Sequence, residues 1–250
     1  MKTRCNHERW LQVPAIKGSE SRLKYGQVVH GWFYARLNRF IAEVFVGGVK
    51  ERVHIKNTGR LRELLLPDAE VLLEVSGNPS RQTRYSLIAV NKEGRWVNID
   101  SQAPNAAAFE AVQAGKVPEL GHIISVKREV TYGDSRFDLY YEHDRGQGFV
   151  EVKGVTLEQE GVAMFPDAPT ARGTKHVLEM ARAVREGYAG AILFLVQMKG
   201  CHTFTPHRQM DEALADALLE ASREGVCILA YDARVTEDGL WLDQPLPVIL

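Results

Sequence analysis

The first 100 residues contain short runs in which apolar and polar residues alternate. A period of two is typical of β-strands, because successive side chains point to opposite faces of a sheet. The runs cover 27–35, 39–46, 49–55, 70–75, 85–90 and 96–99. Strands so short and so closely spaced predict a small closed barrel, an architecture that often binds oligonucleotides. A fragment of a β-sandwich without a ligand is the alternative.

A different pattern follows a polar linker at 101–105. Helical periodicity and capping residues, Asn105 among them, predict helices at 106–113, 170–186 and 211–223. Strand-like runs cover 123–130, 136–141 and 148–155, and apolar runs cover 189–197 and 226–232. Such apolar strands are typical of sheets that helices cover on both faces, so we expect an α/β domain with a sheet of mixed direction. The predicted units are an N-terminal extension at 1–22, a barrel domain at 23–100 and an α/β domain at 101–250.

Charge is distributed unevenly between these two domains. The formal net charge is −1, but the first 100 residues hold 17 Lys and Arg against 10 Asp and Glu. The remaining 150 residues hold 14 against 22. A basic first half suggests a surface that binds a polyanion, although chance clustering of solvated charge would give the same counts.

Two features of the sequence bear on the cellular compartment. The longest apolar run, at 189–196, is too short to cross a bilayer, and the first twenty residues contain no apolar segment typical of a secretory signal. The three cysteines form no CxxC pair, which favours a reducing environment. We therefore expect a cytoplasmic protein without a membrane partner.

The segment 132–153 carries the residues best suited to chemistry. Asp138 lies in one predicted strand, and Glu151 and Lys153 lie at the end of the next. Residues two apart on a strand share a face, so Glu151 and Lys153 project together. If the two strands pair, Asp138 lies beside Glu151, and two carboxylates and one ammonium group converge.

This grouping suits a hard divalent cation, Mg²⁺ or Mn²⁺, because these ions prefer oxygen ligands and often need only one or two protein carboxylates. A bound ion lowers the pKa of an attacking water, and Lys153 would stabilise charge that develops in the transition state. The implied reaction is phosphodiester hydrolysis, with Asp138, Glu151 and Lys153 as candidate catalytic residues. The pattern is loose, and a turn aspartate beside an exposed Glu–Lys pair is the alternative.

The order of helix, hairpin, helix and buried strand resembles that of restriction-endonuclease-like nucleases, the Asp…Glu-x-Lys superfamily. In many of its members a glutamate of the preceding helix also approaches the metal, which makes Glu110 a candidate ligand with Asp138 and Glu151. Helix residues that follow the motif reach substrate phosphate in this superfamily, and Lys175 and His176 are the corresponding candidates. A surface glutamate and a polar helix face are the alternatives.

Longer motifs are shared with one family. The segments RLNRFIAEV, VHIKNTGRLRELL, DSQAPN, YGDSRFD, VEVKGVTLE, AMFPDAPTARGTKH, QMKG and LAYDARVTEDG occur in this order between residues 36 and 239. Together they resemble the sugar fermentation stimulation protein A (SfsA) family. The resemblance implies an N-terminal OB-like barrel, a C-terminal restriction-endonuclease-like domain and DNA binding without sequence specificity. It also implies a role in regulating genes of sugar (maltose) use.

The barrel motifs contain side chains that suit DNA phosphates, because guanidinium and ammonium groups neutralise phosphate and amide or hydroxyl groups hydrogen-bond to it. The candidate DNA-binding residues of the barrel are Arg36, Asn38, Arg39, Lys56, Asn57, Thr58 and Arg60. The aromatic residues Trp32, Phe33, Tyr34 and Phe40 offer rings for base stacking, but we expect most of them in the barrel core.

We therefore expect a DNA-binding protein with a magnesium-dependent nuclease site, and RNA remains open as a second substrate. The alternative is a noncatalytic DNA-binding regulator that keeps the nuclease fold. The sequence does not determine the oligomeric state, so a dimer also remains open.

Overall fold

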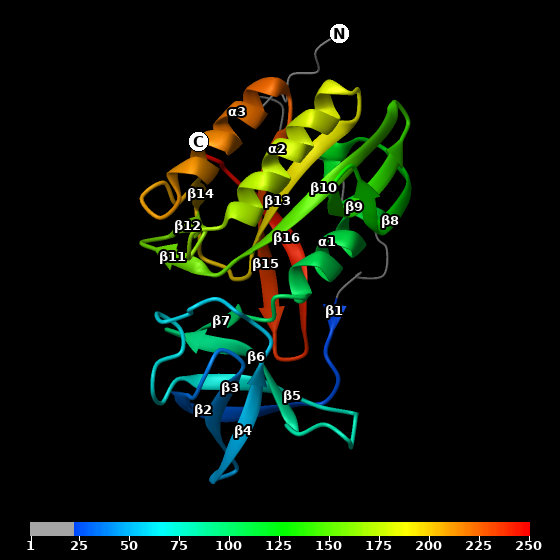
Figure 1. Cartoon of the computed structure of the whole chain (residues 1–250). Helices are drawn as coiled ribbons and strands as arrows, with labels where there is room; N and C mark the ends of the chain where they lie inside the picture. Colours follow the sequence, from blue (N-terminus) through cyan, green and yellow to red (C-terminus); the bar gives the residue numbers. More distant parts are fainter. Residues whose placement is uncertain (1–22) are drawn as a thin grey trace.

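The described part of the chain, residues 23–250 of a computed structural model, forms two units stacked end to end (Figure 1). The smaller unit contains β2 (Val28–Arg36), β3 (Ile41–Val46), β4 (Val49–Ile55), β5 (Glu70–Val75), β6 (Tyr85–Lys92) and β7 (Arg95–Asn98). Their order is β4-β3-β2-β5-β6-β7, and a parallel pairing of β4 with β6 closes five strands into a barrel. The predicted small barrel is confirmed, whereas the extension expected at 1–22 lies outside the described residues.

The strand β1 (Leu23–Lys24) does not belong to this barrel. It pairs antiparallel with β16 (Gly239–Leu246) of the larger unit, with Leu23 opposite Leu240 and Lys24 opposite Gly239. The strand β1 thus lies within the expected barrel range of 23–100 but pairs with the larger unit, and the first strand of the barrel begins at Val28.

The larger unit is built on a seven-stranded sheet in the order β1-β16-β15-β13-β10-β9-β8. Its remaining strands are β8 (Ile123–Tyr132), β9 (Ser135–His143), β10 (Gly146–Val155), β13 (Ala189–Val196) and β15 (Cys227–Thr236). The strands β10, β13 and β15 run parallel and their outer neighbours antiparallel, so the predicted mixed sheet is confirmed. A small second sheet, formed by β11 (Leu157–Gln159), β12 (Val162–Phe165) and β14 (Thr203–Pro206), was not predicted. Its strands are too short for alternation to be recognised.

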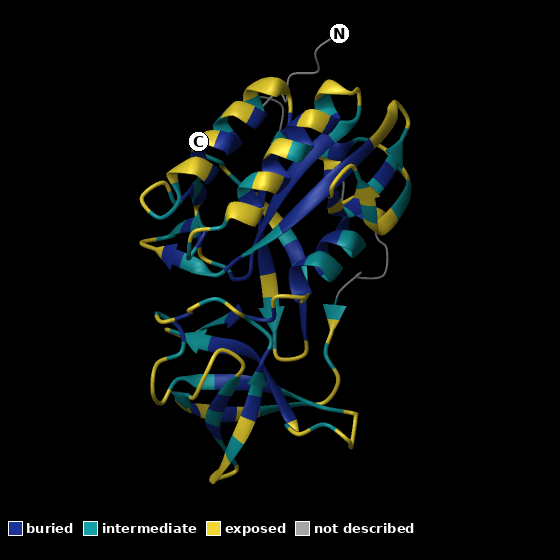
Figure 2. Cartoon of the chain, in the orientation of Figure 1, coloured by how far each residue is buried: buried dark blue, intermediate teal, exposed yellow. Residues whose placement is uncertain are grey.

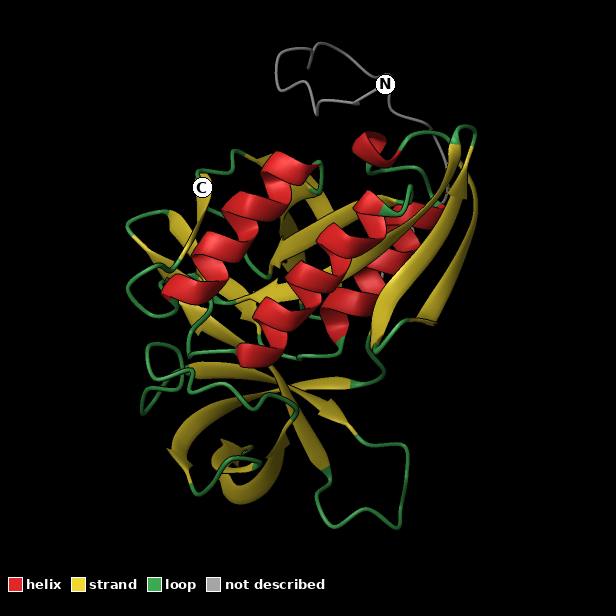
Figure 3. Ribbon diagram, turned by 45° about the horizontal axis from the view of Figure 1, so that its top comes forward, coloured by secondary structure: helices red, strands yellow, loops and turns green. Residues whose placement is uncertain are grey.

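Helices cover both faces of the large sheet. The helices are α1 (Ala103–Gln113), α2 (Ala171–Arg185) and α3 (Glu212–Glu224), with a 3₁₀ turn η1 (Pro118–Leu120) after α1. The helices α2 and α3 lie side by side (Figure 3) and pack in one apolar cluster with Ile192 and Phe194 of β13. The helix α1 packs in a second cluster with Leu193 and Leu195 of the same strand. Because successive residues of a strand face opposite sides, α1 lies on the other face.

Local sequence signals explain where two of the helices begin. The Thr170 hydroxyl accepts the Gly173 backbone N–H at 3.0 Å, and the Asp211 carboxylate accepts the Leu214 N–H at 3.0 Å. Side chains of this kind satisfy donors that a helix leaves free at its first turn. The helix α1 begins at Ala103 instead, with a proline in its first turn, so Asn105 lies inside the helix and does not cap it.

Burial follows this layered arrangement (Figure 2). Seven of the eight residues of β13 are buried, and the outward faces of α2 and α3 are exposed. Stacked rings of Phe194 and Phe204, 4.2 Å apart between centroids, join the large sheet to the small one. Within residues 23–250, no helix is both long and apolar enough to cross a membrane.

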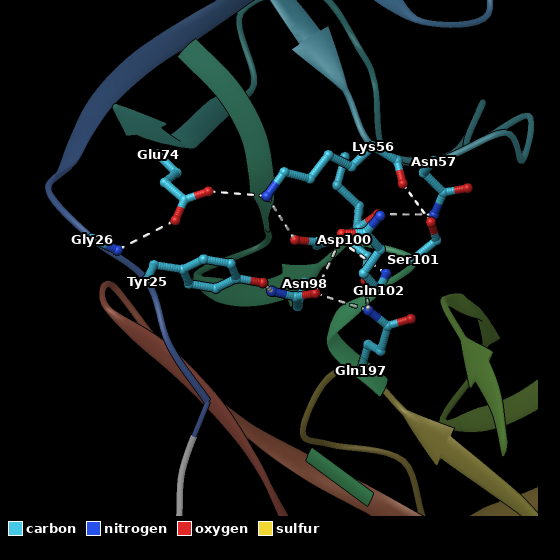
Figure 4. Close-up of polar contacts among 11 residues, drawn as sticks. Tyr25, Gly26, Lys56, Asn57, Glu74, Asn98, Asp100, Ser101, Gln102 and Gln197 are labelled. Carbon is cyan, nitrogen blue, oxygen red and sulfur yellow. Dashed lines mark hydrogen bonds and ion pairs between the residues drawn. The ribbon is translucent and has the colours of Figure 1, made fainter. Parts of the chain in front are cut away.

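Polar contacts join the barrel to the larger unit (Figure 4). The Gln197 amide donates to Asn98 Oδ1 at 2.8 Å and to the Asp100 carbonyl at 3.2 Å. Farther along the interface, the Glu158 carboxylate accepts from Lys92 at 2.9 Å and also from Arg95. These contacts hold the barrel beneath the carboxyl end of β10, the strand that carries Glu151 and Lys153.

Candidate metal and nuclease site

Asp138 lies where the ladder between β9 and β10 ends. The two strands pair from Gly146 opposite His143 to Val150 opposite Leu139, and the regular pairing stops there. Beyond that point the Asp138 side chain replaces a backbone acceptor: Oδ2 accepts the Val152 N–H at 2.8 Å. The other oxygen, Oδ1, accepts from the Asn105 amide at 2.6 Å. Contacts from β10 and α1 therefore fix the orientation of this carboxylate.

Glu151 is held in a different way, because both of its partners share one oxygen. The Lys153 ammonium donates to Oε1 at 2.5 Å, and the Nδ1 atom of His176 bonds to the same Oε1. The second oxygen, Oε2, is buried and has no hydrogen-bond partner among the described residues. The side chain is only 3% exposed, so this lone oxygen is an unsatisfied acceptor inside the protein.

Both carboxylates line one cavity of about 160 Å³. The lining residues are Glu129, Arg136, Phe137, Asp138, Glu151, Val152, Lys153, Arg172 and His176. Four elements therefore supply the polar groups: β8, β9, β10 and the first half of α2. The predicted convergence of Asp138, Glu151 and Lys153 is present in the structure, because strand parity and the hairpin bring all three side chains to one cavity.

The two carboxylates differ in their ionisation. Burial raises the pKa of Asp138 above its usual range, and the nearby negative charge of Glu151 raises it further. Burial also raises the pKa of Glu151, but the His176 hydrogen bond and the Lys153 charge outweigh this effect, and the net pKa is lowered. Glu151 is thus the better stabilised anion, whereas burial and the nearby charge of Glu151 destabilise the ionised form of Asp138.

The donor set fits a hard divalent cation. Within residues 23–250, no three Asp, Glu, His or Cys side chains form a ready metal cage. A Mg²⁺-type ion does not need one, because it keeps several waters and binds one or two carboxylates. The partnerless Oε2 of Glu151 supplies a free ligand atom, and a cation there would relieve the repulsion that raises the pKa of Asp138.

The expectation for Glu110 is not matched by the geometry. Glu110 is not among the residues that line the cavity, whereas Asn105 of the same helix hydrogen-bonds to Asp138. Five helical residues separate the two positions, which is about 7.5 Å along the axis and more than a third of a turn around it. The helix α1 therefore contributes Asn105, which donates a hydrogen bond to Asp138, where we expected it to contribute Glu110 as a metal ligand.

The comparisons with known proteins agree with this arrangement. Residues 102–239 match the sugar fermentation stimulation protein RE domain, and residues 35–99 match the SfsA N-terminal OB domain. A sugar fermentation stimulation protein homolog of Alkaliphilus oremlandii is 55% identical over 225 residues, 88% of this chain and 96% of the relative. A homolog of Clostridium novyi is 46% identical, covering 91% of this chain and 100% of the relative. The chain belongs to the SfsA family.

A solved structure extends the comparison to three dimensions. The structure of Pyrococcus furiosus SfsA in complex with Ca²⁺ superposes with a TM-score of 0.84 and 29% identity. The superposition covers 93% of this chain and 100% of the archaeal one. The OB barrel followed by a restriction-endonuclease-like domain is thus the architecture of the SfsA family.

In this SfsA protein, several of the expected DNA-binding residues have structural partners. Among the described residues, Arg36 donates to the backbone carbonyls of Asn38, Arg39, Asn57, Gly59 and Arg60, at 2.7–3.2 Å. Asn38 accepts two backbone N–H groups of its own loop, and Asn57 bridges Gly59 and Ile99. These bonds use the guanidinium of Arg36, the amide of Asn57 and the Oδ1 atom of Asn38 to hold the loops, and phosphate contact by these three residues stays a prediction.

Lys56 is likewise occupied within the protein (Figure 4). Its ammonium donates to Glu74 at 2.9 Å and to Asp100 at 3.2 Å, and the Asp100 side chain is almost fully buried. Burial lowers the pKa of Lys56, but the hydrogen bonds and charges of Glu74 and Asp100 raise it more, so the net pKa is raised. Lys56 is therefore an ion-pair partner within the fold, and its expected contact with phosphate stays a prediction.

Other expected contacts stay at the surface. Arg39, Thr58 and Arg60 are exposed, and neither guanidinium makes an ion pair within residues 23–250. Trp32, Tyr34 and Phe40 are also exposed, at 54%, 46% and 49%, so the expectation that most of the four rings lie in the barrel core is wrong. Phe33 is buried, because it points into the barrel between its outward neighbours.

On α2, the two expected phosphate contacts separate. Lys175 is exposed and donates to the Asp134 carbonyl at 3.2 Å. His176 is buried and bonds to Glu151, so its expected role at substrate phosphate is not the one its geometry supports. Sequence reasoning also missed Asn105, Arg136 and Arg172 as site residues, although all three lie within the shared motifs.

Proposed function

We propose that this SfsA protein is a nuclease that hydrolyses phosphodiester bonds in nucleic acid with the help of a divalent metal ion. The single observation that carries the proposal is the buried Glu151 Oε2, which has no partner and lies in the cavity that Asp138 also lines. An acceptor left unsatisfied in this way is costly unless a ligand completes it. A restriction-endonuclease-like domain gives such a site a nuclease context.

Each residue of the cavity has a separate task in this proposal. Asp138 and Glu151 hold the ion, which supplies Lewis-acid activation of water and of the phosphoryl oxygen. Lys153 stands beside Glu151 and offsets negative charge as it develops on the phosphate. Arg136 and Arg172 line the same cavity and attract the phosphate backbone.

The nucleic-acid surface of the proposal uses only the polar side chains that the fold leaves exposed. Among the expected contacts, these are Asn38, Arg39, Thr58 and Arg60 on the barrel and Lys175 on α2. The loop that leads to α2 contacts the barrel loop directly, because Asp167 accepts the Arg60 N–H at 3.3 Å. Backbone phosphates bound at Arg60 would therefore lie near the start of the helix that borders the cavity. DNA is the primary partner, and contacts of this kind carry no base specificity.

The relatives support the metal and a regulatory setting. The archaeal SfsA was solved with Ca²⁺, which like Mg²⁺ takes oxygen ligands. The bacterial relatives are named for the stimulation of sugar fermentation. We extend both properties to this chain as parts of the proposal.

The deciding experiment compares wild type, Asp138→Ala and Glu151→Gln on labelled single- and double-stranded DNA and RNA, with Mg²⁺, Mn²⁺ or EDTA. We expect cleavage by wild type that requires metal, and a loss of at least a hundredfold in both variants while DNA binding is retained. Binding by wild type without cleavage under any metal would overturn the proposal and favour a noncatalytic DNA-binding regulator. Cleavage of RNA alone would change the substrate but not the site.

A further inference from the structure

His176 contacts Glu151 from α2, although it lies outside the Asp…Glu-x-Lys motif. It lies six residues after Thr170, the residue that caps α2, and its side chain is 9% exposed. Its Nδ1 atom bonds to Glu151 Oε1. An ionised carboxylate can only accept hydrogen bonds, so the imidazole serves as the donor in this contact.

The contact involves the Oε1 atom of Glu151, which restricts how the carboxylate can turn. Lys153 donates to the same Oε1, so two donors from two elements converge on one atom. A carboxylate whose one oxygen is held twice has little freedom to rotate, and its other oxygen keeps a fixed direction. That other oxygen, Oε2, is the buried atom without a partner.

Lys153 alone does not give the same restraint. Its ammonium is a compact charge on a flexible four-carbon chain, with three donors that turn freely. The imidazole of His176 is planar and buried, and α2 holds it through the Thr170 cap and through Val177 and Met180 in the core. The directional part of the restraint on Glu151 therefore comes from the histidine.

We infer that His176 is a positioning residue: it fixes the rotamer of Glu151 so that Oε2 faces the cavity as a metal ligand. The inference rests on the proposed function only through the metal site. It assigns to α2 a task that matches that of Asn105 on α1, which orients Asp138 from the opposite face of the sheet. Outer partners of this kind orient the ligands of a metal and typically change metal affinity by 10–100-fold when they are removed.

The test measures metal affinity in the whole protein, by titrating Mn²⁺ or Ca²⁺ calorimetrically without nucleic acid. His176→Leu removes the donor and replaces the imidazole with an apolar side chain of similar bulk. His176→Asn keeps a donor close to the position of Nδ1. Leu178→Asn, at an exposed position of the same helix, is the matched control. Melting temperatures without metal report whether each variant is folded.

We expect His176→Leu to bind the metal at least tenfold more weakly, His176→Asn to recover most of the loss and Leu178→Asn to bind as wild type does. Wild-type affinity in His176→Leu overturns the inference and leaves the proposed nuclease intact. Equal weakening in His176→Leu and His176→Asn also overturns it, because the role would then be packing. Metal binding by wild type with the expected variant pattern but no cleavage overturns the proposed function alone. No metal binding by wild type overturns both.

Discussion

The carboxylate of Asp138 accepts the backbone N–H of Val152 at 2.8 Å, at the point where β9 and β10 cease to pair. We also propose the same carboxylate as a metal ligand. One side chain would therefore both extend the hydrogen bonding between two strands and form part of the site. Burial and the charge of Glu151 raise the pKa of Asp138. Without a bound cation, the ionised form of Asp138 is therefore destabilised.

A first prediction follows from this destabilisation of ionised Asp138: binding of a divalent metal ion stabilises the folded protein. Ligand that binds only the folded state at a hundred times its dissociation constant adds about 2.7 kcal/mol to the free energy of unfolding. We expect the melting temperature of wild type to rise with Mn²⁺ or Ca²⁺ and to fall again with EDTA. The rise should be absent in Asp138→Ala, which removes a ligand.

Glu151→Gln is the companion variant for this measurement. Its amide would keep an oxygen for His176 and Lys153 but would turn an N–H₂ donor toward the cavity, where a cation needs an acceptor. The same metal-dependent rise in both variants as in wild type would rule out these two carboxylates as ligands.

Strand parity and hairpin order were sufficient to predict the centre of the site. Glu151 and Lys153 are two residues apart on one strand, and Asp138 lies on its hairpin partner, so local geometry brings them together. The caps at Thr170 and Asp211 were equally readable, because a side chain that caps a helix acts within three residues.

The partners of charged barrel residues could not be predicted in the same way. The type of a residue shows that it can bind phosphate, but not whether a carboxylate or carbonyl already lies within reach. Lys56 meets Asp100, 44 residues later, and Arg36 meets carbonyls 21 to 24 residues away. Asn105 was expected to cap the helix, but α1 begins two residues before it. The Asn105 amide donates instead to Asp138, a partner 33 residues away that the sequence does not reveal.

A second prediction separates surface cations from structural ones on the barrel. Arg39 is exposed and without an ion pair among the described residues, so Arg39→Ala should weaken DNA binding about equally for all sequences. The slope of log affinity against log salt should become shallower by about 1, the value for one lost phosphate contact. Lys56→Ala should leave that slope unchanged and lower the melting temperature, because it leaves the buried Asp100 without its cation. Fluorescence anisotropy at several salt concentrations checks the slopes, and equal slopes for Arg39→Ala and wild type would remove Arg39 from the interface.

A third prediction concerns the loops that Arg36 holds. Its planar guanidinium reaches five carbonyls at once, which the compact ammonium of lysine cannot do. Arg36→Lys should therefore destabilise the protein by about 2 kcal/mol, despite the conserved charge. Differential scanning calorimetry measures the effect, with Arg39→Lys as the control on the neighbouring loop. A melting temperature unchanged in Arg36→Lys would mean that the loops do not depend on these bonds.

A fourth prediction uses pH to test the contact between the two units. Burial raises the pKa of Glu158, but the Gly161 N–H and the charges of Lys92 and Arg95 lower it more, so the net pKa lies below the usual 4.5. An acid whose pKa is depressed on folding stabilises the protein above its unfolded pKa, and this stability is lost as the pH falls through the folded value. Glu158→Gln should therefore cost about 2 kcal/mol at pH 7, and its difference from wild type should shrink as the pH falls below 4.5. Urea unfolding from pH 7 to pH 3 measures the difference, with Glu160→Gln, at an exposed neighbouring position, as the control. If the difference between wild type and Glu158→Gln stays constant over this range, the carboxylate charge does not hold the units together, and packing of the interface must do so instead.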